Sequence, residues 1–140
     1  MYFEYEPDRM KTLTSNWTRS RLELTSVKEQ LDEYFAGSRR RFNLPLHSEG
    51  TLFMEKVWSK LRTIPFGETW SYGELAKQIG NPKASRAVGL ANGRNPIAII
   101  VPCHRVIGAN GTLTGFGGGI ERKKWLLEFE ARAAGKVLKF

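Results

Sequence analysis

The chain has 140 residues, a length that suits one modest domain with at most a small appendage. Its 22 Lys and Arg against 14 Asp and Glu give a formal net charge of +8, which favours an anionic partner such as nucleic acid but fits a basic surface kept for solubility equally well. One cysteine and two histidines exclude an internal disulfide and a Cys/His zinc cluster. Because no apolar leader or membrane-length apolar run is visible, we expect a soluble protein in a reducing, intracellular setting.

The first part of the chain is expected to hold little regular structure. Residues 21–24 are interpreted as a short strand, and apolar side chains repeat at helical spacing from Val27 to Phe35, where Gly37 ends the pattern. The stretch 37–49 contains three consecutive arginines and a proline and has the composition of a linker. We therefore predict a boundary near residue 47, with a shortened N-terminal region at 1–47 and a second domain at 48–140.

After the boundary, the sequence predicts short helices separated by loops. Thr51 is a suitable N-cap for a helix that ends before Pro65, and the apolar face of this helix is expected to contain Phe53, Val57, Trp58 and Leu61. Ser71 and Glu74 form an S-x-x-E capping box, which predicts a second helix that stops at Gly80.

A third helix, from residue 83 to about residue 92, is expected after Asn81-Pro82, which supply an N-cap and a first-turn proline. Two short helices joined by a tight turn predict a helix-turn-helix. The third helix is rich in small residues, namely Ala84, Ser85, Ala87, Gly89 and Ala91. Because glycine costs a helix about 1 kcal/mol relative to alanine, they indicate close approach to another backbone, either DNA or a packed helix. The residues alone favour helix packing.

The last third of the chain leads through an apolar run to the cysteine. Residues 97–101 are interpreted as a short buried strand or extended segment before Cys103. Residues 108–119 form a glycine-rich loop without the spacing of a phosphate-binding loop. A final amphipathic helix at 121–133 is expected to place Trp125, Leu126 and Phe129 on its apolar side. The elements predict an α+β fold that is mostly helical, with a helix-turn-helix and a short strand before the cysteine.

Cys103 permits two interpretations. A cysteine after an apolar run is commonly an inert core residue. A nucleophilic cysteine needs a base to form the thiolate, and His104 is adjacent, although adjacent side chains can cooperate only if the chain turns there or through a water. A third group must orient the histidine, and Glu128 and Glu130 are both candidates. The adjacency of Cys103 and His104 alone favours the inert interpretation.

A wider pattern changes this balance. The run NPIAIIVPCHRV at residues 95–106 resembles the active-site signature of the O6-alkylguanine-DNA alkyltransferases. The segments IPFGETWSYGELA at 64–76, NPKASRAVGLANGRNP at 81–96 and GTLTGFGGGIERKKWLLEFE at 111–130 are also similar to this family. The resemblance covers residues 48–131 in the family's order and spacing, so it identifies 48–140 as a catalytic and DNA-binding domain.

The resemblance implies DNA repair by a single, irreversible transfer of an alkyl group, in particular methyl, from O6 of guanine to Cys103, with O4 of thymine as an alternative target. His104 would withdraw the thiol proton through a water, and Glu130, rather than Glu128, would hold His104. Tyr72 would donate a hydrogen bond to the departing guanine ring, and Asn95 would brace the turn before the active-site strand.

The resemblance also implies how DNA is bound. The second helix of the helix-turn-helix would enter the minor groove of double-stranded DNA containing O6-alkylguanine, where Arg86 would fill the gap left by the flipped nucleotide. A narrow groove explains the small residues Ala84, Ser85, Ala87 and Gly89. Candidate phosphate contacts are Lys83, Arg94 and Arg105. The base pocket would be lined by Tyr72, Val106, Gly115, Phe116, Gly117 and Gly118.

We expect no cofactor, metal or membrane partner, a monomer in solution, and a cytoplasmic location, or a nuclear one in a eukaryote. Family members typically carry a longer N-terminal domain with a ribonuclease H-like sheet, so the region 1–47 departs from the pattern, and Phe116 stands where some members have tyrosine. The rival interpretations are a non-reactive alkyltransferase-like protein that flags alkylated guanine, a Cys-His-Glu hydrolase, and a transcription regulator. Cys103 argues against the first, because those relatives have another residue at this position.

Overall fold

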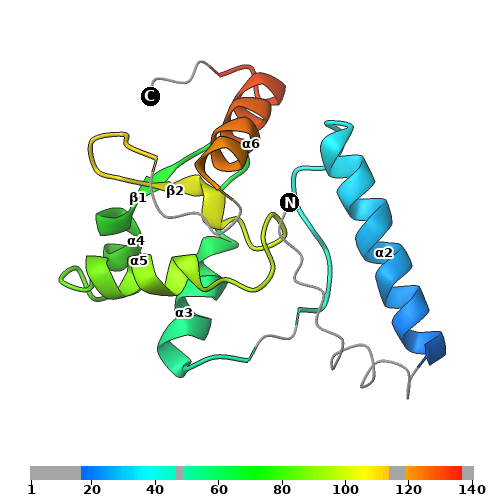
Figure 1. Cartoon of the computed structure of the whole chain (residues 1–140), viewed down its shortest axis with the longest axis horizontal. Coiled ribbons are helices and arrows are strands. Elements are labelled where there is room, and N and C mark those ends of the chain that lie inside the picture. The colour runs from blue at the N-terminus through cyan, green and yellow to red at the C-terminus, as the bar shows by residue number, and fades with distance from the viewer. Residues whose placement is uncertain (1–16, 47–48, 114–118, 137–140) are drawn as a thin grey trace. The chain divides into compact units, whose positions relative to one another are not determined.

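The computed structural model describes residues 17–46, 49–113 and 119–136, without the side chains of residues 17–23. The chain divides into two compact units that separate between residues 47 and 48. Figure 1 shows the helices and strands of both units. Among the described residues, no helix is long and apolar enough to cross a membrane.

In the described part of the N-terminal unit, residues 17–46, the regular element is the helix α2 (Trp17–Phe35). The helix predicted at 27–35 is confirmed, but the strand predicted at 21–24 is wrong, because these residues lie inside α2. The sequence there, Arg-Leu-Glu-Leu, consists of good helix formers, which outweigh a four-residue alternation. The buried ring of Tyr34 contacts Phe42 at 5.5 Å between ring centroids, and the side chain of Gln30 exchanges two hydrogen bonds with the backbone of Asn43. These contacts fix the segment after Gly37 against α2.

The second unit begins with the helices that the capping residues predict. Helix α3 (Leu52–Leu61) starts where the hydroxyl of Thr51 accepts a hydrogen bond from the Met54 amide, at 3.1 Å. Helix α4 (Tyr72–Gln78) starts where the hydroxyl of Ser71 accepts one from the Glu74 amide, at 3.0 Å. Of the apolar face expected on α3, Val57, Trp58 and Leu61 are buried. Both helix starts are confirmed.

Helix α5 (Ser85–Gly93) begins two residues later than predicted. Asn81 does not cap it, because the Asn81 carbonyl accepts from the Ala84 amide and residues 81–84 form a turn instead. Ala84 occupies the N-cap position without a side-chain hydrogen bond. Gly80, with φ of 81°, ends α4 as expected. Helices α4 and α5 pack against each other as the predicted helix-turn-helix.

The strand or extended segment predicted at 97–101 is wrong. This segment is a tight turn, in which the Val101 amide donates to the Ile97 carbonyl at 3.0 Å and Ile99 has a left-handed φ of 73°. Such a φ is uncommon for a β-branched residue, and contacts from outside the turn must hold it. The strands of the unit are β1 (Trp70–Ser71) and β2 (Val106–Ile107), which pair in parallel with Trp70 opposite Val106.

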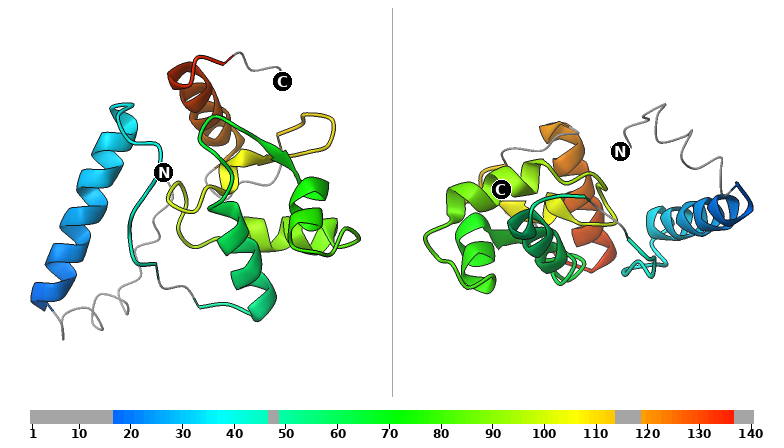
Figure 2. Two further views of the ribbon diagram at one scale, coloured as in Figure 1. Left: turned by 180° about the vertical axis from the view of Figure 1, so that it is seen from behind. Right: turned by 90° about the horizontal axis from the view of Figure 1, so that it is seen from below.

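Helix α6 (Ile120–Ala133) closes the unit, and its inward face differs from the prediction. Leu126 is buried as expected, but Trp125 is 51% exposed and stacks on Phe129 with ring centroids 5.3 Å apart. The inward positions instead include two charged residues, Lys123 and Glu130. Figures 1 and 2 show α6 on one side of the two short strands and helices α4 and α5 on the other. Cys103, His104 and Val106, which lie at or next to β2, are buried in the interior of the unit.

Candidate active site

Cys103 begins a single turn of 3-10 helix, η1 (Cys103–Arg105), directly before β2. The turn before it is held by the side chain of Asn95, whose amide nitrogen donates to the Val101 carbonyl at 2.8 Å and whose oxygen accepts from the Ile97 amide at 3.1 Å. These two bonds hold the backbone around Ile99 and set the direction in which the chain enters η1. Asn95 thus lies where a bracing residue is expected.

The thiol of Cys103 is buried, with 5% of the residue exposed, and burial raises its pKa. Two neighbours oppose this effect. The side chain of Asn95 hydrogen-bonds the thiol, and the positive charge of Lys123 favours the thiolate. The site therefore holds a protected thiol whose ionisation depends on a few polar side chains.

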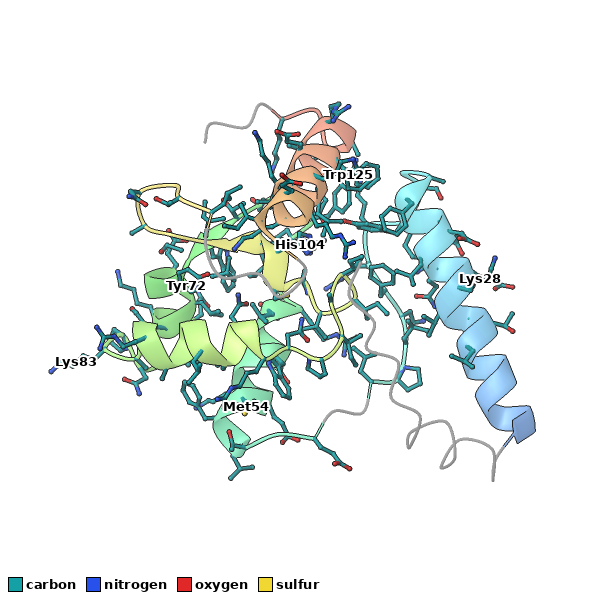
Figure 3. All side chains as sticks on the ribbon, in the orientation of Figure 1. Lys28, Met54, Tyr72, Lys83, His104 and Trp125 are labelled. Atoms are coloured by element: carbon teal, nitrogen blue, oxygen red, sulfur yellow. The ribbon has the colours of Figure 1, made fainter. Side chains whose placement is uncertain are left out.

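His104 and Glu130 form a buried pair behind the cysteine. His104 Nε2 lies 2.7 Å from Glu130 Oε2, and neither side chain is more than 1% exposed. Figure 3 shows His104 in the interior of the unit, beside α6. Burial lowers the pKa of His104, so the neutral imidazole is the dominant form at neutral pH, although Glu130 opposes this shift. Neutral His104 donates its Nε2 proton to Glu130, and Nδ1 is then an acceptor.

Arg105 lies in the interior of the unit and not on the surface, where a phosphate contact was expected. Its Nε and Nη2 donate to the two oxygens of Glu130 at 2.8 and 3.0 Å, and its Nη1 donates to the Ile64 carbonyl at 2.6 Å. With 5% of the residue exposed, the guanidinium cannot reach a phosphate on the surface. Burial alone raises the pKa of Glu130, but the charges and hydrogen bonds of His104 and Arg105 hold it well below its usual range. The expected DNA contact of Arg105 is therefore wrong, and its guanidinium keeps Glu130 ionised.

Lys123 is a site residue that the sequence interpretation missed. Its ammonium donates to the Val106 carbonyl at 2.6 Å and lies 6.0 Å from the centroid of the Tyr72 ring. Burial lowers the pKa of Lys123 to about 8, while a thiolate at Cys103 would raise it. A lysine on an amphipathic helix ordinarily faces solvent, so only its three- and seven-residue spacing to Leu126 and Glu130 pointed to the inner face.

Tyr72 and the small residues of α5 meet at the contact between α4 and α5. A side-chain carbon built on Gly89 would lie 3.6 Å from the Tyr72 ring, and one built on Gly73 would lie 3.9 Å from the Ser85 hydroxyl. Both distances are ordinary van der Waals contacts, so Gly89 lies against the Tyr72 ring without being required there by lack of space. The outward side of α5 carries Arg86, Ala87, Leu90 and Arg94, all exposed, while Ala84 and Ser85 are half-buried.

Of the remaining predicted site residues, some lie in the described part of the structure and others lie outside it. Lys83 is exposed in the turn between α4 and α5, and Figure 3 shows it at the outer end of this pair of helices. Val106, three residues after Cys103 and at the start of β2, is buried. The expected pocket residues Gly115, Phe116, Gly117 and Gly118 lie outside the described residues. The outward side of α5 together with Lys83 forms an exposed basic surface, whereas the reactive groups are internal.

Comparison with known proteins identifies the family. Residues 52–132 match the DNA-binding domain of the 6-O-methylguanine DNA methyltransferases, and residues 2–48 match the ribonuclease-like domain of the same family. The methylated-DNA–protein-cysteine methyltransferase of Mycobacterium tuberculosis (strain ATCC 25618 / H37Rv) is 57% identical over 130 residues, which cover 93% of this chain and 76% of that protein. The protein of the same name from Methanosarcina acetivorans is 57% identical over 115 residues, covering 82% and 74%.

Solved structures agree with the sequence comparison. The crystal structure of Mycobacterium tuberculosis O6-methylguanine methyltransferase aligns with a TM-score of 0.75 at 61% identity, over 78% of this chain and 66% of that chain. The structure of the Mycobacterium tuberculosis protein OGT in complex with DNA aligns with a TM-score of 0.75 at 62% identity, over 77% and 66%. This chain spans about two thirds of those chains. It belongs to the 6-O-methylguanine DNA methyltransferase family.

Proposed function

We propose that this protein repairs DNA by transferring a methyl or other alkyl group from O6 of guanine to Cys103, once per protein molecule. The observation that carries the proposal is a buried cysteine followed by a histidine that is hydrogen-bonded to a buried, ionised glutamate, in a member of this family. The relatives named for acting on methylated DNA are more than half identical to this chain.

The chemistry begins with the thiol proton. Neutral His104 accepts it at Nδ1 through a water, and Glu130 stabilises the imidazolium that forms. The thiolate then attacks the alkyl carbon, a carbon–sulfur bond forms, and the bond to O6 breaks with its electron pair left on guanine. The guanine takes up one proton as it regains its normal form. Tyr72 donates a hydrogen bond to the ring while this charge develops.

The product explains why the protein acts once. A thioether has no hydrolytic exit, so alkylated Cys103 stays alkylated. Lys123 assists the first step, because its charge lowers the pKa of the Cys103 thiol. A hydrolase with a Cys-His-Glu site would instead regenerate its cysteine and turn over many substrates.

The DNA partner is a duplex containing O6-alkylguanine, contacted through the minor groove by a monomer of this protein. The exposed side of α5 supports this, because it combines Arg86 and Arg94 with the small Ala87. A stacked guanine cannot bring O6 to a buried sulfur, so the base must leave the helix. Arg86 then occupies the vacated space. A nucleophilic thiol also requires a reducing compartment, which supports a cytoplasmic location, or a nuclear one in a eukaryote.

The test follows the DNA product. A duplex oligonucleotide with a single O6-methylguanine is incubated with limiting protein, and its nucleosides are quantified by mass spectrometry. We expect O6-methylguanine to become guanine without release of a base, up to one lesion per protein molecule. The nearly isosteric Cys103→Ser variant should convert none. A released base, or conversion of several lesions per protein, would exclude alkyl transfer to the protein.

A further inference from the structure

Two buried side-chain polar atoms lack a hydrogen-bond partner in the described part of the chain, and they belong to the residue that follows Cys103 and to a residue that hydrogen-bonds the Cys103 carbonyl. They are Nδ1 of His104 and Oδ1 of Asn92. Asn92 lies on the inward side of α5 and is 2% exposed. Its amide nitrogen donates to the carbonyl of Cys103 at 3.3 Å, which fixes the direction of the side chain and leaves Oδ1 as the orphaned acceptor.

These two atoms cannot satisfy each other. Nδ1 is an acceptor, because the other ring nitrogen of neutral His104 donates to Glu130, and Oδ1 is an amide carbonyl that can only accept. Native proteins seldom leave buried acceptors unpaired. A group with two hydrogens that also accepts one hydrogen bond satisfies both atoms, and water is the smallest such group.

We propose that Asn92 Oδ1 and His104 Nδ1 together hold the water through which Cys103 gives up its proton, which makes Asn92 a positioning residue for proton transfer. This inference rests on the proposed function. The water donates one hydrogen to each acceptor and accepts the S–H of Cys103. In the transfer, the S–H bond breaks toward the water oxygen while one O–H bond breaks toward Nδ1. The products are a thiolate, an intact water and an imidazolium.

The neighbouring charges do not perform this task. From α6, Lys123 donates to the Val106 carbonyl and Glu130 accepts from His104 Nε2. From η1, Arg105 donates to Glu130 and to the Ile64 carbonyl. These groups set the charge around Cys103 and His104, yet they leave Nδ1 and Oδ1 unpaired. Asn92 therefore adds a position for the water that the charged residues do not supply.

Asn92 also ties the reactive turn to the helix that we propose to bind DNA. Its bond to the Cys103 carbonyl and the bond from Trp58 Nε1 to the Ala91 carbonyl, at 2.9 Å, both anchor the same end of α5. Trp58 supplies a matched control, because its hydrogen bond anchors α5 and involves neither of the orphaned acceptors. A tether alone would affect both variants alike, whereas a role in proton transfer would distinguish them.

The test compares Asn92→Leu and Trp58→Phe with the wild-type protein. Single-turnover rates are measured with free O6-benzylguanine, which needs no base flipping, across a range of pH. For Asn92→Leu we expect the midpoint of the pH–rate profile to rise by roughly one unit, because the thiol must ionise without its relay. The rate near neutral pH should then fall about tenfold and recover to the wild-type plateau at high pH. Trp58→Phe should be less stable but should keep the wild-type midpoint. An unmoved midpoint in Asn92→Leu, or equal shifts in both variants, would overturn the inference.

A second measurement uses the wild-type protein, so it tests the inference even if the Asn92→Leu variant does not fold. Buried water in slow exchange gives nuclear Overhauser contacts to nearby protons. We expect such contacts from one water to the His104 ring and to the side-chain amide of Asn92. Contact with His104 alone, or with neither, would contradict the role of Asn92. If wild-type protein does not react with O6-benzylguanine or with alkylated duplex, the proposed function itself fails. An active wild type with an unmoved Asn92→Leu profile removes only the role of Asn92.

Discussion

Cys103 lies among groups with opposing effects on its ionisation. Burial raises the pKa of the thiol, while the hydrogen bond from Asn95 and the charge of Lys123 lower it. Burial also keeps His104 neutral and therefore ready to accept a proton. The thiol is thus shielded from solvent and from adventitious oxidation, and its thiolate forms only with help from its neighbours.

Replacement of Lys123 by methionine tests this balance. The nearly isosteric Lys123→Met variant removes the positive charge, so the pKa of Cys103 should rise further and alkyl transfer near neutral pH should slow about tenfold. The pKa of Lys123 itself is lowered to about 8, so the wild-type lysine loses its proton as pH rises through that value. The two proteins should therefore approach the same rate above it. Rates are measured with free O6-benzylguanine.

The control for this prediction is Lys124→Met, which removes the same charge from the exposed neighbouring position of α6. It should leave the pH–rate profile where it is in the wild type. If Lys123→Met and Lys124→Met behave alike, the buried ammonium has no influence on the thiol beyond its contribution to net charge.

Individual residues were predicted unevenly, for a physical reason. Resemblance to the family pointed to Cys103, His104 and Glu130, and the structure brings His104 and Glu130 within 2.7 Å. The sequence did not indicate Lys123 or Asn92 as site residues, and Arg105 was predicted to contact a DNA phosphate. The reason is the same for all three residues, because a polar side chain ordinarily faces solvent. Burial of a charged residue depends on a partner distant in sequence, as the Arg105 pair with Glu130 illustrates. No local pattern contains that information.

At the scale of elements, the starts of α3 and α4 were predicted well because their causes are local. Thr51 and Ser71 cap their helices through amides three residues later, a spacing visible in the sequence. The turn at 97–101 was not predicted, because an apolar run ordinarily indicates extended chain. The left-handed Ile99 is held by bonds from Asn95 to both ends of the turn. Side-chain bonds of this kind override the propensity of the run.

Helix α5 has two sides with separate tasks, and this permits a prediction that separates recognition from chemistry. Arg86 is on the exposed side, away from the buried Asn92. If Arg86 occupies the space of the flipped base, Arg86→Ala should repair methylated duplex roughly tenfold more slowly, because extrusion costs a few kcal/mol of stacking and pairing. Its rate with free O6-benzylguanine should stay near that of the wild type. Both rates are measured under single-turnover conditions.

Arg94→Ala is the matched control, because it removes the same charge from the exposed C-terminal end of α5. A lesion placed opposite an abasic position is already loosely held, so it should restore part of the rate of Arg86→Ala and none of that of Arg94→Ala. Equal losses with duplex and free base would place Arg86 in the chemistry or the folding, and its role in flipping would have to be withdrawn.

For the molecule as a whole, both the net charge and the family membership point to DNA as the partner, but neither describes the charges around the buried cysteine. The charge of +8 suits a protein that binds an anionic polymer, yet the groups proposed for chemistry are internal and nearly balanced among themselves. The buried charged side chains set the electrostatic potential around the cysteine; they are Lys123, Arg105 and Glu130. The exposed basic residues include Lys83, Arg86 and Arg94. The match of residues 2–48 to the family's ribonuclease-like domain extends the relationship to the N-terminal unit. The composition of the chain predicts a basic exposed surface, whereas the buried charged residues are found only from the fold.

In the proposed reaction, the protein itself keeps the alkyl group. Intact-protein mass spectrometry after incubation with a duplex containing O6-methylguanine tests it most directly, followed by peptide mapping of the product. We expect a gain of one methyl group, never more, located on Cys103, and no change in mass for the Cys103→Ser variant. A repaired duplex beside unmodified protein, or a methyl group on any other residue, would contradict it.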